Sequence, residues 1–193
     1  MSAAAPLRRA SYEEYLALER SSETKHEYVN GEIYAMAGGT PEHGRLASRL
    51  ARLLGNALAK RPCEVFSSDV RIRVEATGRS TYPDLSVVCS RAVTSAVDAD
   101  AITNPVVLVE VLSPSTESDD RGDKWAHYRR LPSLECYVLV AQDARSVETY
   151  RRDGKRWLYE AFGPGETVHL SGVEVDFAVD ELYASALEGS ATS

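Results

Sequence analysis

Apolar residues recur at helical spacing in two parts of this chain. The clearest case places Leu46, Leu50 and Leu54 on one face, with arginines around the rest of the wheel, and predicts the longest helix. Ser11 is a good N-cap for the first helix, because its hydroxyl can accept a hydrogen bond from a backbone amide of the first turn. Helices are expected at about 12–19, 42–60 and 119–130.

Shorter apolar or alternating runs, bounded by turn residues, predict the strands. The strongest turn signal is Asn30-Gly31, since this pair readily adopts the two positive φ angles of a type I′ hairpin turn. A second turn is expected at Asp153-Gly154. Strands are expected within a hairpin at 27–36 and at about 63–74, 82–89, 106–112, 134–141, 146–152 and 156–162. Together these elements predict an α/β fold, in which helices flank a mixed, twisted central sheet and an N-terminal helix and hairpin precede it.

Length and composition favour one globular domain. The chain has 193 residues, of which 44% are apolar and 26% are charged, and no Gly, Ser or Pro stretch divides it. We expect a single domain at 11–187 between flexible ends at 1–10 and 188–193. No apolar run is long enough to span a bilayer and the start lacks the apolar core of a signal peptide, so we expect a cytoplasmic protein without membrane contact.

The three cysteines, Cys63, Cys89 and Cys136, follow no CxxC or Cys/His spacing. An odd number of scattered cysteines argues against a zinc site and against a disulfide framework. We expect all three to be small core residues.

The net charge of −7 disfavours a nucleic-acid partner, because cations dominate phosphate binding. Basic residues nevertheless gather on two of the predicted helices, where they either contact a nucleic-acid backbone or form ordinary solvated faces. The candidate nucleic-acid contacts are Arg45, Arg49, Arg121 and Arg129.

Two predicted strands carry a carboxylate where most strands have a branched aliphatic residue. Asp84 follows a proline at the start of one strand, and Glu110 lies between two valines in the other. An isolated buried carboxylate is costly unless a cation or a strong donor meets it. If the two strands are neighbours, both acids and the carbonyl of Val111 could converge on one site lined by oxygen, which suits Mg²⁺ or Mn²⁺.

The helix that follows Glu110 offers a positive charge for such a site. Asp120, Lys124 and Tyr128 stand at i, i+4 and i+8, hence on one face, so Lys124 could reach back over the strand ends while Asp120 holds it. Tyr128 is expected to be a packing residue. Three further residues are candidate accessories, namely Glu27 and Asp69 as additional acids and His43 as a phosphate contact or a helix cap.

Four segments carry a more specific combination: KHEYVNGE at 25–32, YPD at 82–84, VEVLSPST at 109–116 and DRGDK at 120–124. Taken together they resemble the Uma-two family of restriction endonucleases, a branch of the PD-(D/E)XK nuclease superfamily. The resemblance covers about 12–152 and implies a restriction-endonuclease-like fold. It also implies a role for each candidate: Asp84 and Glu110 as the metal-binding acids, Glu27 as an accessory acid, and Lys124 as a lysine moved from the strand to the next helix.

The resulting hypothesis is a metal-dependent nuclease that hydrolyses phosphodiester bonds, with DNA as the first expected substrate. Asp84 and Glu110 would hold Mg²⁺, with Glu27 completing the acidic site, and Lys124 would orient the attacking water. Many nucleases of this architecture are dimers that cut both strands by symmetry, so a homodimer is expected.

The sequence also leaves two alternatives open. Leu112 stands two residues beyond Glu110, where the superfamily pattern has its lysine. This departure and the net acidity favour a catalytically inactive nucleic-acid-binding or protein-interaction module that keeps the nuclease fold. The other alternative is a phosphoesterase that acts on small molecules.

Overall fold

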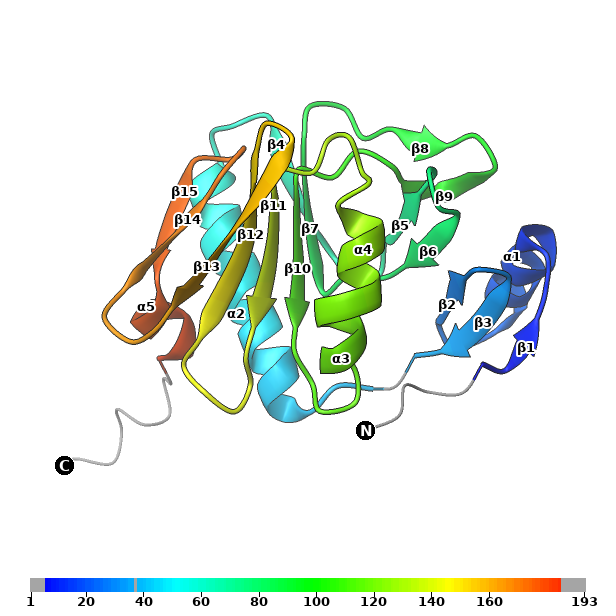
Figure 1. Ribbon diagram of the computed structural model, residues 1–193, viewed down its shortest axis with the longest axis horizontal. Helices are drawn as coiled ribbons and strands as arrows, with labels where there is room; N and C mark the ends of the chain where they lie inside the picture. Colours follow the sequence, from blue (N-terminus) through cyan, green and yellow to red (C-terminus); the bar gives the residue numbers. More distant parts are fainter. Residues whose placement is uncertain (1–5, 37, 185–193) are drawn as a thin grey trace.

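The computed structural model describes residues 6–36 and 38–184 (Figure 1). The expected tail at 188–193 and the first five residues of the expected flexible start lie outside this range. Within that start, Arg8 and Arg9 form a short strand that pairs with the N-terminal hairpin. No helix in the described ranges is both long and apolar enough to cross a bilayer.

The first two predicted helices are present. Helix α1 (Tyr12–Ser21) begins with a capping box, in which the Ser11 hydroxyl and the Glu14 carboxylate each accept a hydrogen bond from the other residue's backbone N–H. Helix α2 (Pro41–Leu58) begins after its N-cap Thr40 and is the longest helix described. Its buried face consists of Leu46, Leu50, Leu54 and Leu58.

The third predicted helix is composite. It consists of α3 (Glu117–Asp119), a π-helical turn η1 (Asp120–Lys124) and α4 (Trp125–Tyr128). In a π-helical turn the backbone bonds run from i to i+5, and such turns are frequent at functional sites. A short additional helix, α5 (Val179–Tyr183), follows the last strand.

Every predicted strand is present, one of them divided, and six further strands were not predicted. The segment expected as one strand at 63–74 turns at 68–70 and forms two strands in different sheets. The Asn30-Gly31 turn has the two predicted positive φ angles, 52° and 84°. The strands are β1 (Arg8–Arg9), β2 (His26–Val29), β3 (Glu32–Ala35), β4 (Cys63–Ser67), β5 (Arg71–Val74), β6 (Arg79–Thr81), β7 (Leu85–Cys89), β8 (Thr94–Ser95), β9 (Asp98–Ile102), β10 (Val107–Val111), β11 (Cys136–Val140), β12 (Val147–Asp153), β13 (Arg156–Phe162), β14 (Thr167–Leu170) and β15 (Val175–Ala178). The six that were not predicted are β1, β6, β8, β9, β14 and β15.

Two mixed sheets organise the α/β fold (Figure 1). The central sheet has six strands in the order β13-β12-β11-β10-β7-β4, and β10 and β11 are its parallel pair. The other sheet has seven strands in the order β1-β3-β2-β6-β5-β9-β8. Strands β14 and β15 form a separate hairpin.

Side-chain alternation along β10 divides the core into two layers. Val107, Val109 and Val111 pack with the leucines of α2 on one face of the central sheet. Leu108 and Leu112 pack on the other face, in the layer that contains Tyr128 of α4. The expected alternation is therefore present, and it places Glu110 on the face covered by the composite helix.

The expectation for the cysteines is wrong in part. Cys63 and Cys89 form a disulfide between β4 and β7, and only Cys136 is a free, buried core residue. The two bonded cysteines are 26 residues apart, but antiparallel pairing of their strands makes them direct partners with a Cα–Cα distance of 3.9 Å. Their spacing in the sequence carried no sign of this register.

Candidate active site

Strand β10 holds Glu110 inside the protein, with 4% of the residue exposed. The hydroxyl of Tyr128 donates a hydrogen bond to Glu110 Oε1 at 2.8 Å. Tyr128 therefore does more than pack, which corrects the sequence-based interpretation of this residue. Its contact fixes the orientation of a carboxylate that has apolar neighbours along its own strand.

Electrostatics make Glu110 an unusual acid. Burial raises its pKa well above the usual value for a carboxyl group. The ammonium of Lys124 opposes this shift, while the charges of Asp120 and Asp84 add to it. The net direction is upward, so the ionised form of Glu110 lacks enough positive charge around it.

Lys124 lies at the centre of three carboxylates. Its Nζ is 2.8 Å from Asp120 Oδ1, 3.3 Å from Glu110 Oε1 and 3.5 Å from Glu27 Oε1. Burial alone would lower the pKa of Lys124, but the charges of Glu110 and Glu27 outweigh it and hold the pKa well above the usual value. Lys124 is therefore a permanent cation, and Asp120 on the same helical turn holds it as expected.

Glu27 enters the cluster from β2, in the other sheet. Arg79 of β6 donates to Glu27 Oε2 at 3.0 Å, and the Thr81 hydroxyl donates to Glu27 Oε1. Burial raises the pKa of Glu27, but the charges of Lys124 and Arg79 more than offset this and leave the pKa lowered. Glu27 is thus ionised and paired, in contrast to Glu110.

Arg79 was not anticipated from the sequence. Its side chain is 1% exposed, and its Nη2 also lies 2.7 Å from Asp119 Oδ2 at the end of α3. The guanidinium thereby ties the second sheet to the helix that carries Lys124. A lone arginine in a short polar strand gives no sign of such a role, because its partners lie about 40 and 52 residues away in the chain.

Asp84 lies in the turn just before β7, not inside a strand. Antiparallel pairing of β7 with β10 places it beside the end of β10, where its Oδ2 accepts the backbone N–H of Val111 at 2.7 Å. The N–H and C=O of one strand residue point to the same edge of that strand. The carbonyl of Val111 is therefore directed toward Asp84, as the predicted oxygen-lined site requires.

His43, on the first turn of α2, also contacts Asp84. Its Nε2 lies 3.2 Å from Asp84 Oδ2. The hydrogen bond with Asp84 raises the pKa of His43, against the opposite effect of burial. Both contacts to Asp84 are made to the same oxygen, which leaves the other oxygen able to bind a cation. We call the carboxylates of Glu27, Asp84, Glu110 and Asp120 the carboxylate cluster.

Gln142 is a second residue that the sequence analysis missed. Its Nε2 donates to the carbonyl of Leu112, and its Oε1 accepts the hydroxyl proton of Thr40 at 2.6 Å. Gln142 thereby links the end of β10 to the N-cap of α2, the helix that carries His43. Its place just after a buried strand is the only signal that could have drawn attention to it.

The structure does not bring Asp69 to this cluster. Asp69 lies on the turn between β4 and β5, with 79% of its side chain exposed, and pairs with Lys25 at 2.5 Å. Its role as an accessory acid stays a prediction, and its described contacts lend it no support.

The four arginines expected to contact nucleic acid lie outside the carboxylate cluster. Arg121 forms ion pairs with Glu117 and Glu148, and Arg45 pairs with Glu42. The remaining two are Arg49, whose Nε donates to the carbonyl of Glu181, and Arg129, which is exposed at the end of α4. Phosphate contacts through these side chains stay a prediction.

The donor set around Glu110 fits a hard divalent cation. Among residues 6–36 and 38–184, no group of three or more His, Cys, Asp or Glu side chains forms a ready-made metal cage. Mg²⁺ characteristically uses one or two carboxylates and keeps several waters. Asp84, Glu110 and the Val111 carbonyl are donors of the kind that requirement names, and Asp84 lies at the end of β10 through its bond to the Val111 amide.

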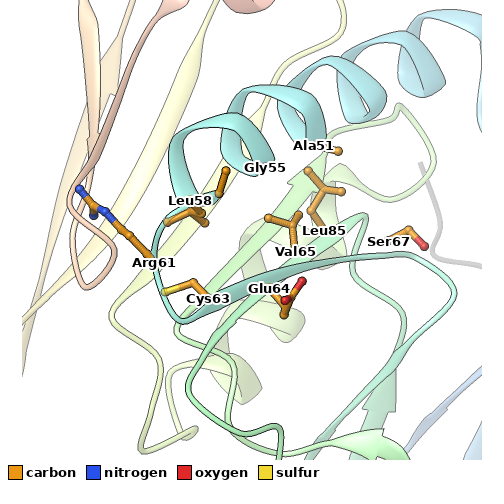
Figure 2. A pocket seen from close by; sticks show the side chains of 10 residues that line it. Ala51, Gly55, Leu58, Arg61, Cys63, Glu64, Val65, Ser67 and Leu85 are labelled. Carbon is orange, nitrogen blue, oxygen red and sulfur yellow. The ribbon is translucent and has the colours of Figure 1, made fainter.

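A separate groove of about 500 Å³ lies between α2 and β4 (Figure 2). Leu58, Val65 and Leu85 line it together with the exposed Glu64. No member of the carboxylate cluster takes part in its lining. Its polar lining consists of Arg61, Glu64 and Ser67, and none of these residues belongs to the ion-pair network of Lys124, so the cluster remains the better candidate for chemistry.

Comparison with known proteins now gives the family. The Uma2 model, described as "Putative restriction endonuclease", matches residues 12–181. The chain belongs to the Uma2 family. This match includes all the residues of the carboxylate cluster together with Lys124, and it makes the protein restriction-endonuclease-like at the level of its family.

Similar proteins cover nearly the same length. Protein slr1290 of Synechocystis sp. is 38% identical over 183 residues, which are 94% of this chain and 95% of that protein. Protein sll1609 of the same organism is 34% identical over 164 residues, or 84% and 93% of the two chains. A crystal structure from Anabaena variabilis, described as "a putative nuclease belonging to DUF820", shares the fold with a TM-score of 0.74, covering 89% of this chain and 96% of that one at 21% identity.

Proposed function

We propose that this Uma2 protein is a metal-dependent nuclease that hydrolyses phosphodiester bonds, with DNA as its first expected substrate. The observation that carries the proposal is the buried ammonium of Lys124, shared by Glu110, Glu27 and Asp120 next to Asp84. A structural ion pair would need one acid for one lysine. Here the carboxylates outnumber the cations, which favours a site that takes up further positive charge.

Asp84, Glu110 and the carbonyl of Val111 would hold Mg²⁺ or Mn²⁺ at the end of β10. The bound ion would polarise a phosphoryl oxygen and lower the pKa of a coordinated water. Tyr128 keeps Glu110 oriented through its hydroxyl, and the backbone amide of Val111 keeps Asp84 oriented.

Lys124 would orient the attacking water and stabilise the negative charge that develops on the phosphate. A fixed ammonium in a buried site stabilises such charge better than one in water, because it needs no reorganisation. Asp120 and Glu27 hold the ammonium in place, and Arg79 in turn holds Glu27. Lys124 thus takes over, from the helix, the position that Leu112 cannot fill from the strand.

The test is plasmid nicking by the purified protein with Mg²⁺ and with EDTA. We expect nicking with Mg²⁺, none with EDTA, and none from Asp84→Asn or Glu110→Ala in either condition. Glu64→Ala, which removes an exposed acid on β4 away from the cluster, is the matched control and should cut like the wild type. Equal behaviour of wild type and both cluster variants would exclude hydrolysis at this site.

The alternative function is a catalytically inactive nucleic-acid-binding or protein-interaction module. Leu112 favours it, because it is buried in the core where a strand lysine would stand. DNA binding that shows the same affinity with and without Mg²⁺, and no cleavage, would support this alternative. Turnover of a small phosphate ester without affinity for duplex DNA would instead indicate a small-molecule phosphoesterase.

A further inference from the structure

The central sheet ends in a long, regular strand edge at β13. Strand β13 has seven residues, and every one of them is in continuous register with β12. In the described residues its outer edge has no strand partner. The edges of the seven-stranded sheet are different, since β1 and β8 have two residues each. Natural proteins usually shorten, bend or cover an edge that must stay unpaired.

The hairpin turn determines which backbone groups of β13 point outward. Asp153 and Arg156 are Cα partners across a two-residue loop, and Gly154 has a φ of 60°, as the first position of a type II′ turn requires. A two-residue loop makes its flanking residues a hydrogen-bonded pair, and hydrogen-bonded and non-hydrogen-bonded pairs then alternate. The outward N–H and C=O groups therefore belong to Trp157, Tyr159 and Ala161.

The side chains along this edge suit a partner. Leu158 is 37% exposed and Tyr159 is 54% exposed, two of the few large apolar residues that reach the surface. Arg156 stands two residues before Leu158, and Glu160 stands two residues after it. Opposite charges are thus placed symmetrically about an exposed leucine, on the same side of the strand.

We propose that β13 pairs antiparallel with β13 of a second copy of this chain, about a two-fold axis that passes beside Leu158. In this register Leu158 faces its own counterpart, and Arg156 of each chain faces Glu160 of the other. Trp157 of each chain likewise faces Tyr159 of the other. Opposite charges and aromatic pairs placed directly across an antiparallel ladder are stabilising.

Charge and apolarity distinguish this register from its neighbours. An axis beside Glu160 would bring two carboxylates face to face, and like charges directly opposite are destabilising. An axis beside Tyr159 would place Leu158 opposite Glu160 on both sides. Within one chain, Glu160 has a weak pairing with Arg151 at 3.5 Å, so it can accept a second cation.

The pairing would join two six-stranded sheets into one continuous sheet with a carboxylate cluster in each half. It supplies an interface for the homodimer expected from the sequence, yet it is a property of the sheet edge and does not depend on the proposed nuclease activity. A measurement of the oligomeric state of the protein therefore tests this proposal independently of any cleavage assay.

The first test is sedimentation of the full chain over a range of concentrations. We expect a dimer for the wild type and a monomer for Leu158→Lys, because this substitution places two ammonium groups face to face at the axis. Val97→Lys is the matched control, since Val97 is 58% exposed on the turn between β8 and β9, which belong to the other sheet, and should leave the dimer intact. A monomeric wild type, or a dimer that persists in folded Leu158→Lys, would overturn the proposal.

A charge exchange guards against variants that merely misfold. Arg156→Glu alone and Glu160→Arg alone each create two like-charge contacts, so each should dissociate the dimer. The double variant restores both ion pairs in reversed polarity and should restore dimerisation. Failure of the folded double variant to dimerise would rule out this register.

Cross-linking tests the register directly. Leu158→Cys places two thiols across a non-hydrogen-bonded pair, where side chains approach most closely, and should give a covalent dimer on mild oxidation. Glu160→Cys places its thiol opposite Arg156 and should give none. The reverse result would show that the axis lies beside Glu160, contrary to the proposal.

Discussion

Two buried polar networks in this protein have similar ingredients, but the pKa values of their buried acids Asp98 and Glu110 shift in opposite directions. Around Arg71, the second sheet buries Asp98, which accepts bonds from the arginine at 2.9 and 3.0 Å and from the Tyr12 hydroxyl at 2.8 Å. Burial raises the pKa of Asp98, but Arg71 outweighs it and the net direction is downward. For Glu110, by contrast, the net direction is upward.

The contrast separates structure from function in physical terms. Asp98 accepts two hydrogen bonds from Arg71, which lies farther from its other acids, 3.7 Å from Glu19 and 3.6 Å from Asp100. With the Tyr12 hydroxyl as a further donor, the charge of Asp98 is compensated within the chain. Lys124 instead lies closer to Asp120 than to Glu110, 2.8 against 3.3 Å, and does not offset the burial of Glu110. A lowered pKa indicates a buried acid whose charge is compensated, whereas strongly raised values are enriched at functional sites. Each prediction below tests this difference.

The largest effect is expected on cleavage. Lys124→Met removes the ammonium that would face the phosphate, and we expect the nicking rate to fall by about 100- to 1000-fold, typical for loss of one charge-stabilising group. Lys60→Met, at an exposed lysine beyond the end of α2, is the matched control and should cut normally. A normal rate for Lys124→Met would remove the lysine from the mechanism.

The largest effect on stability is expected in the other network. Asp98→Ala leaves Arg71, 11% exposed, without its main partner, and breaking a buried pair in this way costs about 3–5 kcal/mol. Urea denaturation should show that loss in the free energy of unfolding. The nicking rate per folded molecule should not change. A loss below about 1 kcal/mol, the value typical of surface pairs, would show that Asp98 is not compensated as described.

The pH dependence of stability should show the contribution of the same pair, Asp98 and Arg71. Because the pKa of Asp98 is lowered in the folded state, its contribution to the free energy of unfolding is present above the pKa of an unfolded aspartate and is lost as the pH falls through the folded value. The stability difference between wild type and Asp98→Asn should therefore shrink below about pH 4. A difference that grows on acidification would contradict the sign of the shift.

Glu110→Gln in metal-free protein should not lose stability, in contrast to Asp98→Ala. Replacing an incompletely compensated carboxylate by an amide of the same shape removes a desolvation cost, so the free energy of unfolding should rise or stay within about 1 kcal/mol. Denaturation in EDTA measures this value. A loss of stability comparable to that of Asp98→Ala would mean that the chain compensates the buried charge in both networks.

The smallest effect on stability is expected from the N-cap of α1, the helix that carries Tyr12. Ser11→Ala removes half of the capping box of α1 and should cost about 1 kcal/mol. Cleavage should not change, because α1 supplies residues to the network of Arg71 and none to the carboxylate cluster. A cleavage defect in the folded variant would show that the two networks are coupled.

Local features of the fold were predictable because their causes are local. Asn30 and Gly31 adopt positive φ where hairpin geometry needs it, and Ser11 meets its partner within one helical turn. The face shared by Asp120, Lys124 and Tyr128 follows from helical spacing, and all three are buried as that spacing implied. The π-helical turn among them was not predictable, because it depends on how the helix packs on the sheet.

The sequence by itself determined the main helices and the strands of the central sheet, the alternation that turns Glu110 away from α2, and the residue types of the candidate site. Only the tertiary structure decided that Arg79 meets Glu27, that Cys63 bonds Cys89, and that Asp84 accepts the amide of Val111. These contacts join residues that lie 52, 26 and 27 positions apart in the chain. Their register depends on the packing of the whole core, which no local pattern of residues contains.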